Sequence, residues 1–129
     1  MKLRILGDSV RLRLSKSDVD TLRETGRVAE TVHFGAGAAA ALTYALQLGD
    51  DVGEVTARLD GTQMTVTMPR ARGLAWANGT DVGISAEQSL PGEAALALLI
   101  EKDFKCLAPR EGEEDYDGFD NPDVGAKTC

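Results

Sequence analysis

The sequence is poor in aromatic residues, histidine and cysteine. Of its 129 residues only 5% are aromatic, and it contains one histidine and two cysteines. A single histidine leaves little scope for a Ser-His or Cys-His catalytic pair. The GxSxG turn of hydrolases and the glycine-rich loops that hold phosphates are both absent from the sequence. The sequence therefore offers no recognised catalytic motif, and its core must rely on Leu, Val, Ile and Ala.

Long apolar runs are also missing. No stretch approaches the roughly 20 apolar residues of a membrane-spanning helix, and the opening MKLRILGDS has no apolar core of signal-peptide length. We therefore expect a cytoplasmic protein without a membrane partner. A reducing cytosol disfavours a disulfide between Cys106 and Cys129. The net charge of −7 argues against a nucleic-acid partner, because phosphate binding needs a basic face.

The pattern of apolar residues predicts an α+β fold. Alternating residues around Gly7-Asp8 and around Asp60-Gly61 each predict a hairpin. Helices are predicted over residues 15–26 and 69–79, and further strands over residues 27–34, 42–48, 81–87 and 94–104. We expect about seven or eight strands in a mainly antiparallel, strongly curled sheet with two short helices and no internal repeat. The apolar run 94–104 predicts a central strand buried on both faces, and Trp76 is expected in the core.

The charge is concentrated near the carboxyl end. We predict a single α+β domain over residues 1–107 and an acidic tail over residues 108–129. Seven carboxylates lie within residues 111–123: Glu111, Glu113, Glu114, Asp115, Asp117, Asp120 and Asp123. These seven negative charges equal the net charge of −7 of the whole chain, so the other residues together are close to neutral.

Three stretches carry a family resemblance. They are MKLRILGDSVRLRLSKSDVD at the start, HFGAG with LTYAL in the middle, and IEKDFKCL with FDNPD at the end. Together they resemble a family of small, uncharacterised bacterial proteins. The resemblance implies a single soluble domain that includes the acidic tail. It implies no activity, no cofactor and no catalytic residue.

Two groups of residues are candidate metal ligands. Asp115, Asp117, Asp120 and Asp123 are spaced closely enough to supply oxygens to calcium, although the glycine and the closing glutamate of an EF-hand are out of place. The alternative is a solvated or partner-facing tail. Cys106, Cys129 and His33 are candidate zinc ligands. The alternatives are a buried hydrophobe for Cys106 and an ordinary strand residue for His33.

A basic stripe is the remaining candidate site. Four cations, Lys2, Arg4, Arg11 and Arg13, alternate along two predicted strands, so all four can share one sheet face. We expect Arg58 to extend this face from another strand. That face would suit an anion. A curled sheet would also suit triphosphate hydrolysis, with Glu101, Lys102 and Asp103 nearby. The alternative is a polar face turned to water.

Taken together, these features favour a non-enzymatic binding or interaction domain with an acidic C-terminal arm. Its partner would be another protein or a further copy of the chain. A metal-binding or phosphate-handling enzyme that uses the basic strand face is the alternative.

Overall fold

The computed structural model describes residues 1–104 and Phe119. Within them the chain forms eight strands and two α-helices, in agreement with the α+β prediction. In chain order these are β1 (Lys2–Ile5), β2 (Ser9–Leu14), α1 (Lys16–Thr25), β3 (Arg27–His33), β4 (Ala41–Gly49), β5 (Thr56–Asp60), β6 (Gln63–Pro69), α2 (Arg70–Asn78), β7 (Gly83–Ser89) and β8 (Ala95–Lys102), with a short 3-10 turn (Ala38–Ala40) before β4. The predicted domain boundary after residue 107 falls outside the described residues.

The strands form two four-stranded sheets rather than one curled sheet. The first has the order β1-β2-β8-β7 and the second β3-β4-β6-β5. In each sheet the central pair is parallel, β2 with β8 and β4 with β6, and the outer pairs are antiparallel. Four of the six pairings are antiparallel, as expected, but both sheets are mixed, and the expectation of one strongly curled sheet was wrong. Hairpin signals are local, whereas these parallel pairs join strands from opposite halves of the chain and leave no turn signature.

The two halves of the chain have the same architecture. Each is a hairpin, a helix and a second hairpin, and exchanging the halves converts one sheet order into the other. The registers agree: Leu12 lies opposite Ile100 in the first sheet, and the equivalent Val66 lies opposite Leu46 in the second. The sequence showed no repeat because the halves share apolar spacing rather than residue identity.

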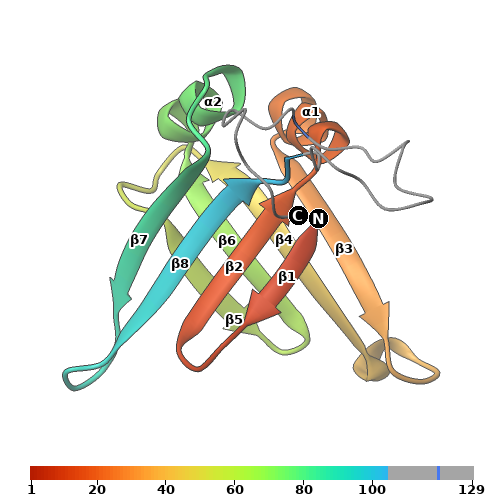
Figure 1. Cartoon of the computed structure of the whole chain (residues 1–129). Helices are drawn as coiled ribbons and strands as arrows, with labels where there is room; N and C mark the ends of the chain where they lie inside the picture. Colours follow the sequence, from red (N-terminus) through yellow and green to blue (C-terminus); the bar gives the residue numbers. More distant parts are fainter. Residues whose placement is uncertain (105–118, 120–129) are drawn as a thin grey trace.

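The two sheets face each other across one core, and both helices cover the same end (Figure 1). Val19 and Leu22 of α1 and Trp76 of α2 are buried in that core, as predicted for the tryptophan. Helix α1 begins at a capping box between Ser15 and Asp18. No helix in the described part of the chain is long and apolar enough to span a membrane.

Two local predictions need correction. The loop of the second hairpin consists of Gly61 and Thr62, with Asp60 still paired to Gln63; only glycine readily adopts the positive φ of 59° found at Gly61. Strand β8 is central, but it is not buried on both faces. Leu98 and Ile100 are buried, whereas Glu101 on the other face is half-buried.

Candidate anion-binding surface

Four cations lie together on the outer face of the hairpin β1–β2. Lys2 is directly opposite Arg13, and Arg4 is directly opposite Arg11. Residues directly opposite each other in paired strands project from the same face. We call Lys2, Arg4, Arg11 and Arg13 the basic cluster. Like charges placed opposite one another are destabilising unless anions compensate them.

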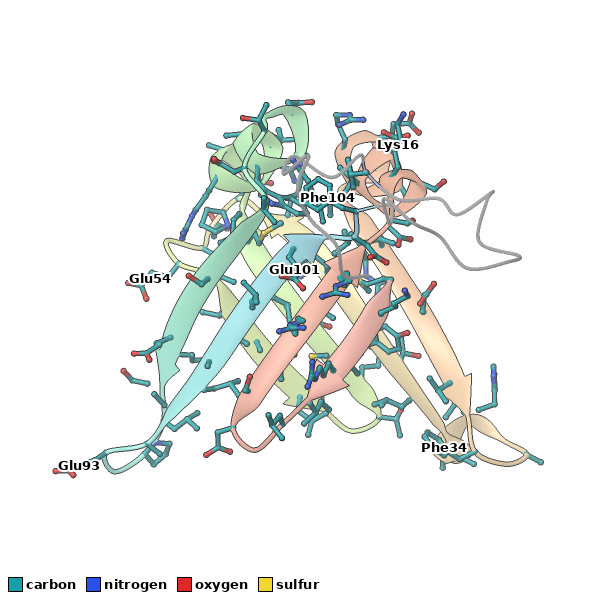
Figure 2. All side chains as sticks on the ribbon, viewed as in Figure 1. Lys16, Phe34, Glu54, Glu93, Glu101 and Phe104 are labelled. Carbon is teal, nitrogen blue, oxygen red and sulfur yellow. The ribbon has the colours of Figure 1, made fainter. Side chains whose placement is uncertain are left out.

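Two carboxylates, Glu101 in β8 and Asp103 directly after it, compensate part of this charge. The guanidinium of Arg13 donates two hydrogen bonds to Glu101, of 2.8 and 3.0 Å, and Arg11 lies 3.6 Å from the same carboxylate. The ammonium of Lys2 lies 3.1 Å from Asp103, whose side chain is 10% exposed. These contacts engage the cluster at the end nearer the helices (Figure 2).

Arg4 differs from the other members of the basic cluster. Among the described residues, no carboxylate forms an ion pair with it. A hollow of about 110 Å³ lies beside it, lined by Arg4, Leu6, Ser9 and Arg11. Two guanidinium groups and a hydroxyl are suited to hold a carboxylate or a phosphate group through charge-assisted hydrogen bonds.

Arg58 does not join the basic cluster. It lies on β5 in the other sheet, in the position equivalent to that of Arg4. The surrounding face is polar and mostly uncharged, with a hollow of about 370 Å³ lined by three charged side chains, Arg27, Arg58 and Asp60, and by Gln47, Thr56, Gln63, Thr65 and Thr67. Threonines thus occupy the positions that correspond to Lys2, Arg11 and Arg13. The same backbone therefore carries one charged and one largely neutral outer face.

A second charged hollow, of about 340 Å³, lies beside the basic cluster and was missed by sequence reasoning. The amino group of Met1 lies 2.7 Å from Asp18 and 3.1 Å from Glu30. Burial favours the protonated form of Asp18, but hydrogen bonds from the terminal ammonium and from Ser15 outweigh it and lower the pKa of Asp18. The N-terminus, α1 and β3 come together only in the tertiary structure. No local spacing in the sequence therefore predicts this hollow.

Lys102 forms a further polar centre within the core. Its ammonium donates a hydrogen bond of 2.9 Å to the carbonyl of Gly79 and lies over the rings of Trp76 and Phe119, at 5.4 and 5.5 Å. Burial lowers the pKa of Lys102. In the sequence, this polar centre was indicated only by a lysine at the end of an apolar strand.

Phe119 contacts the folded body. Its ring packs edge-on against Phe104 with 5.7 Å between centroids, and its amide donates to the carbonyl of Asp103. The acid-rich segment is therefore attached to the domain at Phe119. Whether Tyr116 makes a similar contact lies outside the described residues.

Most of the predicted metal ligands fall outside the part of the chain that can be described. These are Asp115, Asp117, Asp120, Asp123, Cys106 and Cys129. His33 is described, and it is exposed at the end of β3. Within residues 1–104 and Phe119, no cluster of three or more His, Cys, Asp or Glu side chains is arranged to hold a metal ion.

Fold and surface together define a small α+β domain of two mixed sheets with outer faces of different chemistry. The family comparison matches residues 1–123, and its description is "Family of unknown function (DUF7009)". The chain belongs to this family, which confirms the resemblance to an uncharacterised family. No curated protein and no solved structure matches the chain.

Proposed function

We propose that the chain is a non-enzymatic binding domain that holds an anionic group of a protein partner on its basic cluster. The observation that carries this proposal is the opposition of Arg4 and Arg11 across the hollow of about 110 Å³. An anion between the two guanidinium groups relieves the repulsion of a like-charged pair. Arginine also binds carboxylates and phosphates through two parallel hydrogen bonds.

A comparison of the two equivalent hairpins indicates that the basic cluster is not required for folding. The equivalent hairpin, β5–β6, has Thr56, Thr65 and Thr67 where β1–β2 has Lys2, Arg11 and Arg13. Threonine suits a half-exposed strand. Because one hairpin is built without this concentration of charge, its presence on the other supports a binding role.

The acid-rich residues 111–123 are a partner segment of matching charge, either in the same chain or in a further copy. Phe119, the one described residue of this segment, donates its amide to the carbonyl of Asp103, whose side chain pairs with Lys2, and this contact supports the pairing. An exposed ion pair contributes little, typically below about 1 kcal/mol. The pairing would therefore weaken as salt is added.

Among the described residues the nearby carboxylates already have cationic partners. Glu101 pairs with Arg11 and Arg13, and Asp103 pairs with Lys2. The triphosphate-hydrolysing alternative also needs a strongly curled sheet, for which the two mixed sheets provide no support. The geometry therefore favours binding over catalysis.

An NMR titration of the full chain with an aspartate oligopeptide tests the proposal. We expect the largest amide shifts in β1 and β2, with affinity falling as salt is added. Arg4→Gln and Arg11→Gln should each weaken binding by about two- to fivefold, the range of exposed ion pairs. Arg58→Gln, the equivalent position on the other sheet, is the matched control and should not change it. Equal shifts on both sheets, or no effect of Arg4→Gln, would refute the proposal.

A further inference from the structure

Large apolar side chains are exposed at the end of the molecule opposite the helices. Ile5 is 62% exposed and Leu6 70%, both at the tip of hairpin β1–β2. Phe34 and Leu59, at two other hairpin ends, are 75% and 71% exposed. Figure 1 shows these hairpin ends on the side of the molecule away from α1 and α2, spread apart from one another, and Figure 2 labels Phe34 there. Of these side chains, Leu6 also lies beside the charged hollow, and exposed apolar surface rimmed by polar residues marks an interaction site.

Leu6 connects this apolar surface to the basic cluster. It follows Arg4 on the outer face of the hairpin and lines the same hollow as Arg4, Ser9 and Arg11. Its amide donates to the carbonyl of Ser9 at 3.1 Å, which closes the hairpin and fixes the tip. One small hollow is thus lined by two guanidinium groups and an exposed leucine.

We infer that the partner is an acidic peptide with an apolar side chain next to its carboxylates, which packs on Leu6 while the carboxylates bind Arg4 and Arg11. This inference rests on the proposed anion-binding function and adds the specificity of the partner. Exposed ion pairs alone bind weakly. Burial of apolar area on the same hairpin adds a favourable contribution and displaces water from the ion pairs.

The charges around the tip favour a peptide over an anionic lipid surface. Asp8 lies in the turn of β1–β2, and Asp60 and Glu93 lie at neighbouring hairpin ends. Figure 2 labels Glu93 at the outermost point of its loop. A flat anionic bilayer would meet these carboxylates and be repelled. A narrow peptide in the hollow between Arg4 and Arg11 contacts only this one hairpin, and Asp60 and Glu93 belong to other hairpins.

Two peptides of equal charge provide the test: Asp-Asp-Leu-Asp-Asp and Asp-Asp-Ser-Asp-Asp, both with blocked ends. Titrated against the full chain, the leucine peptide should bind about fivefold more tightly, as expected for partial burial of one leucine. Leu6→Ser should abolish that difference. Val82→Ser is the matched control, since Val82 is also exposed but lies beside α2 at the opposite end, and it should preserve the difference.

The outcomes separate the two proposals. If both peptides bind equally and both need Arg4, the binding function stands and the apolar specificity is refuted. If neither peptide depends on Arg4, the binding function itself is refuted. Leucine-dependent binding that survives Arg4→Gln, or binding to phosphatidylserine vesicles in preference to either peptide, also overturns the inference. Because Leu6 is exposed, Leu6→Ser should retain the wild-type circular dichroism spectrum.

Discussion

Lys102 and Leu48 occupy equivalent positions in the two halves of the chain. Lys102 lies opposite Leu14 in the first sheet, as Leu48 lies opposite Met68 in the second. Both residues are buried, Lys102 at 5% exposure and Leu48 at 7%. The same place in the fold therefore accepts either an apolar side chain or an ammonium that is hydrogen-bonded and in contact with aromatic rings.

Two substitutions of Lys102 should consequently differ. Lys102→Leu should change the free energy of unfolding by less than about 1 kcal/mol, because a well-packed apolar residue often replaces a buried charge without loss. Lys102→Ala should cost about 2–3 kcal/mol, since it leaves a cavity. Urea unfolding followed by the fluorescence of Trp76, the sole tryptophan, measures both. Equal damage by the two variants would show that the charge itself is essential.

Tyr44 should make the protein sensitive to alkaline pH. Burial and its hydrogen bond of 2.9 Å to Glu30 raise the pKa of Tyr44 to about 12. An unfolded tyrosine loses its proton near pH 10. Between these values the unfolded state binds fewer protons than the folded state, so the free energy of unfolding falls as pH rises.

Phenolate absorbance tests this directly, because the chain holds only two tyrosines. One phenol should titrate at about 12, and that transition should disappear in Tyr44→Phe. The variant should cost about 1 kcal/mol at neutral pH through its lost hydrogen bonds. It should then lose less stability than wild type between pH 9 and 11. Titration of both phenols near pH 10 would contradict the prediction.

Asp18 should stabilise the fold at neutral pH and cease to do so in acid. It closes the capping box of α1 by accepting a hydrogen bond of 3.0 Å from the amide of Ser15. Because its pKa is lowered in the folded state, its contribution is fully present above the ordinary pKa of about 4 and is lost as pH falls through the folded value. Asp18→Asn should cost about 1 kcal/mol at pH 7 and almost nothing below the folded pKa.

Urea unfolding of both proteins across acidic pH checks this, with Asp20→Asn as the control. Asp20 pairs with Arg23 on the exposed surface of the same helix, so its loss should cost less than about 0.5 kcal/mol. A cost for Asp18→Asn that does not vary with pH would contradict the assigned role.

Gly73 is expected to be required inside α2, although glycine is a poor helix former. A Cβ at this position would lie 2.3 Å from Cδ2 of Leu48. Gly73→Ala should gain about 1 kcal/mol of helix propensity but incur overpacking of about 1–3 kcal/mol. We expect a net loss of about 1 kcal/mol in thermal or urea unfolding.

Two further variants test whether the clash between the new methyl group and Leu48 causes this loss. Gly53→Ala, where a Cβ would meet no atom within 4 Å, should be neutral or slightly stabilising. Leu48→Val combined with Gly73→Ala should recover part of the loss, because it shortens the side chain that the new methyl group meets. A neutral Gly73→Ala variant would show that α2 moves away from β4 at little cost.

The local elements of the fold could be predicted from the amino-acid sequence alone. Alternation around Gly7 and Gly61 indicated two hairpins, and Gly26 marked the end of α1. The spacing of the basic cluster placed four cations on one face. These signals were readable because each arises from residues that are near in the chain. Turn conformation, helix capping and strand alternation need no distant partner.

The way in which the hairpins combine depends on contacts between residues that are distant in the sequence. The pairs β2–β8 and β4–β6 join residues from opposite halves of the chain. The first pair brings Glu101 to Arg13, and Arg58 lies in the other sheet. The folded chain also places Trp76 and Phe119 beside Lys102. The free energy of such pairing comes from burying a shared apolar core. The alternation of apolar residues shows which face of each strand is buried, but it does not show which strands pair. Many strand orders are compatible with one sequence pattern, and the packing of the side chains selects one of them.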